Sequence, residues 1–394
     1  MIKRVNINKN KKEGITTMKK NNLKMIVATG VLFLSGLFAK EMSGASGISS
    51  AKIAEGMENQ SPQISVVNIN NVAYWIGADG AYTTAGSPNG TQADYPIFTG
   101  GAIYASGMLW GSKVKDVVQD DGSLGGQTGQ EIRVGGSSYA HGLKPGRIIT
   151  DANGKALGSD DPANHHVWRV RTDWATADLT NDAANFYSVA SADVSAAQIA
   201  TVKGQYEFDW MNWPAAWGAP YHDVDGNGAY DAAVDVPGYP GADQTVWTVA
   251  NDVPLIVDAN GDSTGYLNTS PSLAGADAIG IELQITLWGY AFGASDPLGN
   301  VIFKKATMHY KGTPDTPDGA TMDDTYFALF SDPDLGNFTD DYVGCDVPLS
   351  FGYVYNGNRL DGVFNGIYNL AVPAAGYDFL QGPKDTYDID GDED

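Results

Sequence analysis

The most regular alternation of apolar and polar residues lies at positions 280–292, GIELQITLWGYAF. Its apolar residues occupy alternate positions: Ile281, Leu283, Ile285 and Leu287. The positions between them are polar: Glu282, Gln284 and Thr286. Successive side chains of a strand point to opposite faces, so this period of two predicts a strand with one buried face and one wetter face.

Similar short runs recur from about residue 71, separated by Gly, Asn, Asp and Pro. This texture is typical of a mainly β protein, and we predict an antiparallel β-sandwich-like domain with long Gly/Asp-rich loops. The other expected strands are Val72–Ile76, Gly101–Trp110, Glu131–Val134, His166–Arg171, Gln244–Ala250, Val301–Tyr310, Thr325–Phe330 and Pro348–Tyr355. We expect the last three to follow the 280–292 strand as antiparallel neighbours. A division into two subdomains near residue 240 stays open.

One segment has a helical period instead. Apolar and aromatic residues recur there at three- and four-residue steps: Ile199, Val202, Tyr206, Trp210 and Trp213. Pro214 ends the run, and Asp193 or Ser195 stands at the position of an N-cap. The pattern predicts one prominent amphipathic helix over about 194–213, with its aromatic face packed on the sheet.

The N-terminal region has a different character. From Met18, three lysines precede an uncharged 15-residue run, Met25–Ala39. A basic stretch before a short apolar run is the layout of a secretory signal peptide, and a bilayer helix needs about 20 apolar residues. We therefore predict a signal peptide with its cleavage region over 18–46, a linker over 47–71 and a secreted domain over 72–394. We interpret residues 1–17 as an extension from a start codon assigned too early, and an uncleaved membrane anchor is the alternative.

Removal of such a leader makes the chain strongly acidic. Residues 1–40 hold nine of the 24 Lys and Arg, which leaves 15 basic residues against 46 acidic ones. That charge repels nucleic acid and attracts cations, so we expect no nucleic-acid partner. Separately, we expect no transmembrane span in the mature chain. Cys345 is the single cysteine, so an intramolecular disulfide is excluded.

The clearest candidate for metal binding is DVDGNGAYDAAVD, residues 223–235. Oxygen-bearing groups stand at loop positions one, three, five, seven, nine and thirteen: Asp223, Asp225, Asn227, Ala229 through its carbonyl, Asp231 and Asp235. Gly228 supplies the sharp turn at position six, but Val234 stands where a helix–loop–helix calcium site has glutamate. The match is to the shorter loops of secreted proteins, which predicts structural calcium; an Asx turn without metal is the alternative.

A second acidic group lies in SDPDLGNFTDDYVGCD, between two expected strands. Its carboxylates are Asp332, Asp334, Asp340, Asp341 and Asp346. Such crowding costs Coulomb energy unless a cation lies among them, so calcium and a solvated loop are both retained as interpretations. Weaker examples of the same pattern are Asp258, Asn260 and Asp262, and Asp388, Asp390 and Asp392.

Aromatic residues immediately precede the first calcium loop, in WMNWPAAWGAPY. Trp210, Trp213, Trp217 and Tyr221 are candidates for a carbohydrate-stacking platform, although we favour their packing between the helix and the sheet. No residue is assigned a catalytic role, because the histidines lack zinc-site spacing and no nucleophile motif is present. Whether the chain is an enzyme stays open, and the absence of such motifs argues against it.

Several phrases together resemble a known group of proteins: AYWIGADGAY (73–82), WRVRTDWATADLTNDAA (168–184), DWMNWPAAWGAPYHDVDGNGAYD (209–231), SDPDLGNFTDDYVGCD (331–346) and LSFGYVYNG (349–357). They resemble the N-terminal region of large secreted proteins of Bacteroidota- and Ignavibacteria-like bacteria, many of which end in a type IX secretion sorting domain. The resemblance implies export and surface attachment, and it specifies no activity. The present sequence has no such sorting domain, and we expect its acidic ending, DTYDIDGDED, to be the exposed end of a truncated chain.

These observations predict a secreted or cell-surface structural or adhesive protein with structural calcium loops. Its expected partners are other surface proteins or glycans, and self-association is compatible with the sequence. The alternative is a glycan-acting protein: a calcium-dependent carbohydrate-binding module or a glycoside hydrolase that uses paired carboxylates.

Overall fold

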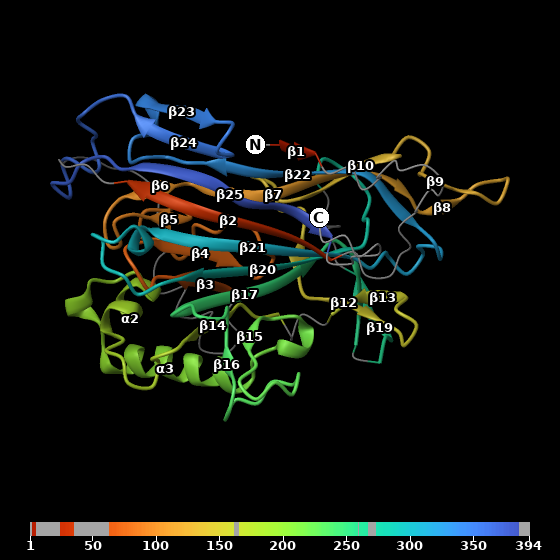
Figure 1. The fold of residues 1–394 in the computed structure, drawn as a ribbon, viewed down its shortest axis with the longest axis horizontal. Helices are drawn as coiled ribbons and strands as arrows, with labels where there is room; N and C mark the ends of the chain where they lie inside the picture. The colour runs from red at the N-terminus through yellow and green to blue at the C-terminus, as the bar shows by residue number, and fades with distance from the viewer. Residues whose placement is uncertain are drawn as a thin grey trace.

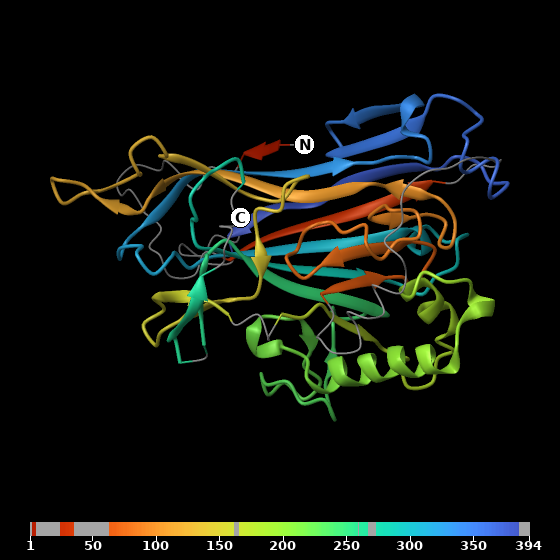
Figure 2. The ribbon, with the colours of Figure 1, turned by 180° about the vertical axis from the view of Figure 1, so that it is seen from behind.

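Two antiparallel sheets pack face to face across the main apolar core (Figures 1 and 2). The computed structural model describes residues 2–4, 24–34, 63–160, 165–258, 260–266 and 273–385. The first sheet has the order β1 (Ile2–Arg4), β22 (Thr321–Asp332), β7 (Ala105–Lys115) and β10 (Ile132–Gly136). The prediction of a mainly β, sandwich-like domain is confirmed.

The second sheet is larger. Its order is β11 (Lys144–Pro145), β17 (Gln244–Asn251), β20 (Ile281–Gly289), β21 (Val301–Tyr310), β2 (Lys24–Leu34), β25 (Ala374–Asp385), β24 (Phe351–Asn356) and β23 (Asp341–Asp346), and β14 (Trp168–Arg171) also pairs with β17. Strands from both sides of residue 240 therefore pair with one another in this sheet and in the first one.

The core between the sheets is built from alternate residues of facing strands. The strand β20 is the clearest example, since its Leu283 and Ile285 are each 1% exposed and belong to the same cluster as Trp110 of β7 and Phe327 of β22. The prediction that one face of β20 is wetter is wrong, because all nine residues of that strand are buried. Loops and the helical region cover its second face, where Gln284 Nε2 donates a hydrogen bond to the Trp217 carbonyl at 2.8 Å.

A small third sheet lies between the sandwich and the helices. Its order is β3 (Ile64–Val67), β4 (Ala73–Gly77), β5 (Ala93–Asp94) and β6 (Gly101–Ile103). Strand β4 is buried on both faces: Tyr74 and Ile76 join the main core, whereas Ala73 and Trp75 join a second cluster with the helices. The strand β3 falls inside the expected linker, so the folded part begins earlier than residue 72.

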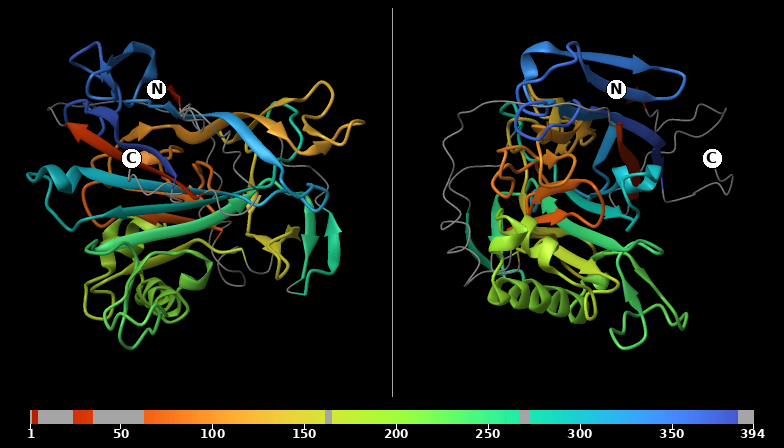
Figure 3. Two further views of the ribbon diagram at one scale, coloured as in Figure 1. Left: turned by 45° about the vertical axis from the view of Figure 1, so that its right-hand side comes forward. Right: turned by 90° about the vertical axis from the view of Figure 1, so that its left-hand side faces the viewer.

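Two α-helices cover the lower side of the second sheet in Figure 1 and are seen from another side in Figure 3: α2 (Thr180–Phe186) and α3 (Ala196–Met211). The helix α3 begins with a capping box, in which the Ser195 side chain accepts from the Gln198 N–H and the Gln198 side chain accepts from the Ser195 N–H. The buried residues of α3 are Val202, Tyr206 and Asp209. The predicted helix is thus present, but its buried face includes a carboxylate that the apolar pattern does not indicate.

Short elements complete the fold. The remaining strands are β8 (Val117–Val118), β9 (Leu124–Gly125), β12 (Ile148–Thr150), β13 (Ala156–Ser159), β15 (Tyr221–His222), β16 (Val236–Pro237), β18 (Leu255–Val257) and β19 (Ser263–Tyr266). The 3₁₀ helices are η2 (Ser191–Asp193), η3 (Ala215–Trp217), η4 (Pro297–Asn300) and η5 (Phe338–Asp340).

Two expected neighbours of the 280–292 strand lie elsewhere. The strand β21 does pair with β20. The strand β22 pairs with β7 in the first sheet, and β24 pairs with β23 and β25 in the second sheet, away from β20. The segment 341–346, expected as a loop, is the strand β23, which forms a hairpin with β24. The run 101–110 divides at Tyr104 into β6 and β7, which belong to different sheets.

The predicted signal peptide overlaps the strand β2, while 18–23 and 35–46 lie outside the described residues. Within the part of the chain that the structure describes, no helix has the length and apolar character needed to cross a bilayer.

Candidate functional site

The loop 223–235 connects β15 to β16, which pair with each other as a small hairpin. Asp223 organises the first half of the loop, since its carboxylate accepts from the backbone N–H groups of Gly226 at 2.8 Å and Gly228 at 2.8 Å. Both glycines have positive φ, 71° and 76°, a conformation that suits glycine best. These hydrogen bonds, that of Gly228 foremost, lower the pKa of Asp223 and keep it ionised.

Asp235 closes the loop from its far end. Its Oδ1 accepts from the Val224 N–H at 2.9 Å and its Oδ2 from the Asp231 N–H at 2.8 Å. Its side chain is therefore fixed, and the residue is 2% exposed. The consequence is convergence: Asp223, Asp225 and Asp235 each place one carboxylate oxygen within 4.8 Å of the others. Among the described residues, this is the one group of three or more His, Cys, Asp or Glu side chains with that property.

The other predicted ligands of this loop flank the convergence. Asn227 Oδ1 accepts from the Ala229 N–H at 2.7 Å, and Asn227 Nδ2 donates to Asp225 Oδ2 at 2.8 Å. Asp231 Oδ1 accepts from the Ala233 N–H at 2.9 Å and lies outside the group of three. Asp235, at position thirteen, belongs to the group of three and stands one position beyond the place that glutamate has in a helix–loop–helix site.

The loop is tied to the end of α3. Trp210 Nε1 donates to the Ala232 carbonyl at 3.2 Å, and the Tyr230 hydroxyl donates to the Trp210 carbonyl at 2.5 Å. The Tyr221 ring contacts the Tyr230 ring edge-on, with centroids 5.5 Å apart. Anything that orders the loop therefore also orders the junction between the helix and the sandwich.

The four aromatic residues considered as a sugar platform pack in an apolar cluster with residues of β14 and β17. Trp213 is 4% exposed, and its Nε1 donates to the Pro220 carbonyl at 2.8 Å. Trp217 is covered by the Arg147 guanidinium, 3.9 Å from the ring centroid. Trp210 and Tyr221 are partly buried against the same cluster. Because a stacking platform must present ring faces to solvent, these side chains do not form one.

The second acidic group is spread over several elements. Asp332 ends β22, Asp340 ends η5, and Asp341 and Asp346 lie at the two ends of β23. Burial, with the nearby Asp332 charge, raises the pKa of Asp334 to about 6. These five carboxylates do not converge as those of 223–235 do.

Asp341 is the most perturbed carboxyl of that group. Burial raises its pKa to about 7, and the charges of Asp334, Asp340 and Asp361 add to the effect. Asp361 is a member of this acidic cluster that the sequence pattern misses, because it lies 15 residues beyond Asp346. Asp361 is 3% exposed and accepts from the Phe364 and Asn337 N–H groups.

The weaker acidic examples behave as turns or fall outside the structure. Asp258 Oδ1 accepts from the Asn260 and Asp262 N–H groups at 2.9 and 3.0 Å, an Asx turn between β18 and β19. Asp388, Asp390 and Asp392 lie outside the described residues.

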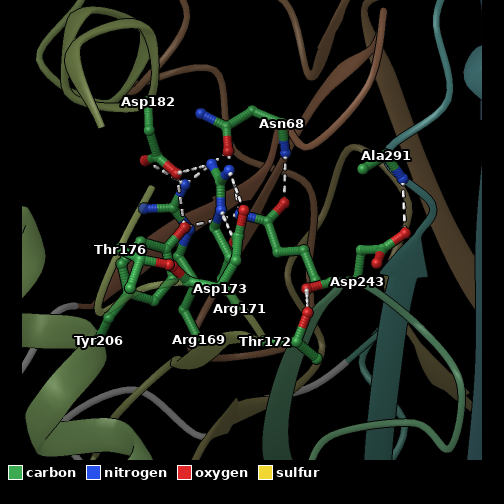
Figure 4. A network of polar contacts seen from close by, with 11 residues as sticks. Asn68, Arg169, Arg171, Thr172, Asp173, Thr176, Asp182, Tyr206, Asp243 and Ala291 are labelled. Carbon is green, nitrogen blue, oxygen red and sulfur yellow. Dashed lines mark hydrogen bonds and ion pairs between the residues drawn. The ribbon is translucent and has the colours of Figure 1, made fainter. Parts of the chain in front are cut away.

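A buried polar network joins the helices to the sheets (Figure 4). Arg169 Nη2 donates to Asp182 Oδ1 and to Asn68 Oδ1, each at 2.6 Å, and the Tyr206 hydroxyl donates to Asp182 Oδ2 at 2.6 Å. Gln244 Nε2 donates to the Tyr206 hydroxyl at 2.7 Å. All of these side chains are buried, so the network fixes the packing of the helices against the sheets.

A histidine and a carboxylate extend this buried region. His166 Nε2 lies 2.7 Å from Asp209 Oδ1, and Asp209 Oδ2 accepts from the Arg169 N–H at 2.7 Å. A histidine beside a carboxylate is a frequent catalytic pair, but here the two side chains are only 6% and 3% exposed. Asp209 therefore anchors α3 to β14.

A group of exposed aromatic rings lies on the β23–β24 hairpin. Tyr342 and Tyr355 are directly opposite each other in the antiparallel pairing, with ring centroids 6.0 Å apart at 26°. Phe351 and Tyr353 continue the row, 5.7 Å apart at 24°. Tyr342, Tyr353 and Tyr355 are 59%, 37% and 47% exposed. We call this row the aromatic ladder; its signal in the sequence is the alternation in FGYVY, residues 351–355.

Comparison with protein-family models, with curated proteins and with solved structures gives no match to this chain.

Proposed function

We propose that this chain is an exported structural or adhesive protein of the cell surface, and that its loop 223–235 binds one structural calcium ion. The convergence of Asp223, Asp225 and Asp235 within 4.8 Å carries the calcium part of this proposal. The export part is supported by the basic and apolar leader pattern of residues 18–39.

The chemistry of the loop favours calcium over softer metals. Three carboxylates, the Asn227 amide and the Ala229 carbonyl offer hard oxygen ligands, which suit calcium, an ion with six to eight such ligands. Three like charges so close repel one another, and a divalent cation between them removes that repulsion. The acidic surface raises the local concentration of cations around the loop.

The expected role of the ion is structural. The loop contacts α3 through Trp210 and Tyr230, and α3 packs on β14 through Asp209. Calcium would therefore stabilise the junction between the helical layer and the sandwich. Such stabilisation is what a structural protein of the cell surface needs. No arrangement among the described residues supports a catalytic role for the ion.

Calorimetric titration of the full chain with calcium tests the site. We expect one ion per chain with a Kd of about 10⁻⁴–10⁻³ M, the range of extracellular modules. Asp225→Asn should weaken binding at least about tenfold, because it removes one ligand charge from the group of three. The matched control is Asp258→Asn, in an Asx turn outside that group, which should leave the affinity unchanged. Equal affinities for wild type and Asp225→Asn would contradict the assignment.

A glycan-binding role is the second candidate, and the aromatic ladder is the observation that favours it. Nearly parallel exposed rings can stack on the apolar C–H faces of sugars. Pull-down with insoluble polysaccharides tests this role: Tyr355→Ala should reduce retention, while Phe292→Ala, an exposed aromatic residue on another loop, should not. Equal retention of both variants, or no retention of the wild type, rejects it.

A further inference from the structure

The strand β2 fills a place between two other strands of the large sheet. Lys24–Leu32 pair with the residues 301–309 of β21, and Met25–Leu34 pair with residues of β25, both in antiparallel orientation. Within the described part of the chain, β21 and β25 do not pair with each other, and each is joined on its other side to β20 or β24. In Figure 1, β2 lies between β25 and β21 along most of its length. One strand thus bridges the two halves of the sheet.

This bridging strand coincides with the predicted leader. Residues 24–34 cover most of the uncharged run Met25–Ala39, and cleavage after Ala39 or among the small residues that follow would remove them from the mature chain. The backbone N–H and C=O groups of β21 and β25 that pair with β2 would then face a gap in the sheet as wide as one strand. Unpaired strand edges of this kind readily accept another extended chain.

The two flanking strands present an apolar inner face to that place. On β21, Ile302, Ala306 and Met308 are buried in the main core, and the residues 303, 305 and 307 between them are half-buried. On β25, Ala375 and Tyr377 belong to the same core. An occupant must therefore alternate, with apolar side chains toward the core.

A buried lysine lies beside this place. Lys304 of β21 is 6% exposed and lines a small cavity together with Phe379 of β25 and Met108 of β7. Burial lowers its pKa to about 8, and its ammonium group has no hydrogen bond or ion pair with another described residue. The inner face is thus apolar with one unpartnered cation, which favours an occupant that brings a polar or acidic group opposite Lys304.

We propose that the place between β21 and β25 is a strand-acceptor site, that residues 24–34 occupy it until the leader is cleaved, and that an extended segment of another protein occupies it afterwards. This inference rests on the export part of the proposed function and is independent of the calcium part. The recognition is strand addition, in which main-chain hydrogen bonds give affinity and alternate side chains give specificity.

The printed sequence favours a different protein as the donor over a second copy of this chain. After residue 39 a long uncharged run, residues 95–112, contributes to β6 and β7, and both of these strands are already paired in the folded chain. The donor strand should run antiparallel to β21 over about nine residues, the length of its pairing with β2. Association of the processed chain with itself would place the donor in a second copy and overturn this choice.

A nicked full chain tests the site. A specific protease sequence inserted after Gly47 allows cleavage of the folded protein without removal of its N-terminal fragment. We expect the fragment to remain bound after cleavage, and we expect a fluorescent peptide of sequence KMIVATGVLFL, with a charged solubilising tag, to replace it on prolonged incubation. The Val31→Pro peptide should bind at least about tenfold more weakly, because Val31 is paired on both sides and proline donates no ladder hydrogen bond.

Each outcome decides the proposal. Exchange of the native-sequence peptide, with weak binding of the Val31→Pro and scrambled peptides, supports it. Failure of the peptide to exchange overturns it, as does equal binding of all three peptides. The mass of the exported chain tests the export part separately: a chain that retains residues 24–34 after export has a permanent β2 and refutes the acceptor role, and the calcium titration is unaffected by that result.

Discussion

Arg169 Nη2 and Asp182 Oδ1 form a hydrogen-bonded ion pair at 2.6 Å, with side chains that are 6% and 2% exposed. The pair joins β14 to α2. The Tyr206 hydroxyl of α3 donates a hydrogen bond to the second oxygen of Asp182, which joins α3 to the same carboxylate. Three separate elements of the chain thus meet at one carboxylate. Removal of one partner leaves a buried charge without compensation, which is costly in a region of low dielectric.

Asp182→Ala should therefore lower the free energy of unfolding by about 3–5 kcal/mol, measured by urea denaturation. The matched control is Asp173→Ala, which removes one carboxylate partner of Arg171 at a side chain that is 52% exposed. Because about half of the Asp173 side chain is exposed, this pair should contribute at most about 1 kcal/mol. Equal losses in the two variants would show that the buried network does not hold the helices.

Calcium should raise the melting temperature of the wild type, and a chelator should reverse the rise. A ligand that binds only the folded chain stabilises it by mass action, which at 10–100 times the Kd is about 1.4–2.7 kcal/mol. Asp225→Asn, with an affinity at least about tenfold weaker, should reduce this response at the same calcium concentration and leave the melting temperature in chelator nearly unchanged. Asp235→Ala should abolish it and also destabilise the metal-free protein, because its buried carboxylate accepts two backbone N–H groups. An undiminished calcium response in both variants contradicts the site.

Two glycine substitutions should have opposite effects on stability. Gly204 is exposed in α3, and a Cβ there meets no atom within 4 Å, so Gly204→Ala should stabilise the protein by about 0.5–1 kcal/mol. A Cβ on Gly86 would lie 2.1 Å from the Trp75 ring, which is 1% exposed. Gly86→Ala should destabilise by about 1–3 kcal/mol through overpacking. Thermal melts of the two variants side by side check both signs.

Stability should depend on pH between about 4 and 7 through Asp334 and Asp341. Their folded-state pKa values of about 6 and 7 lie above the ordinary value of 3.8, so the folded chain holds protons that the unfolded chain has released. The stability that these groups contribute is present at low pH and is lost as the pH rises through 6 and 7.

In chelator, Asp341→Asn should therefore reduce the fall in unfolding free energy between about pH 4 and pH 7. The amide keeps an acceptor for the Leu335 N–H, which Asp341 Oδ2 accepts at 2.8 Å. Asp258→Asn is the control, because hydrogen bonds, that from the Asp262 N–H foremost, lower the pKa of Asp258 and place its titration below this range. A pH profile of Asp341→Asn that coincides with that of the wild type would refute the assignment.

The sequence by itself determined what depends on neighbours along the chain. Period-two runs indicated strands such as β17, β20 and β21, and the N-cap candidates Asp193 and Ser195 indicated the start of α3, where the structure uses Ser195. Each of these signals lies within a few residues of the chain. The turn chemistry of 223–235 is local in the same way: glycine positions and side-chain acceptors shape the loop wherever it lies in the fold.

Only the tertiary structure decided which strands pair and which polar groups are buried. The runs of β21 and β22 look alike in the sequence, yet they belong to different sheets, because the pairing of β22 with β7 joins segments about 200 residues apart. Glu282 reads as a solvent-facing residue, but it is 1% exposed because Lys311 and the Ile148 backbone cover it. Asp182 and Asp209 are polar residues in helices, and only long-range packing makes them the anchors of those helices. Local patterns record which residues can be buried, whereas the partner that buries them is set by contacts between distant parts of the chain.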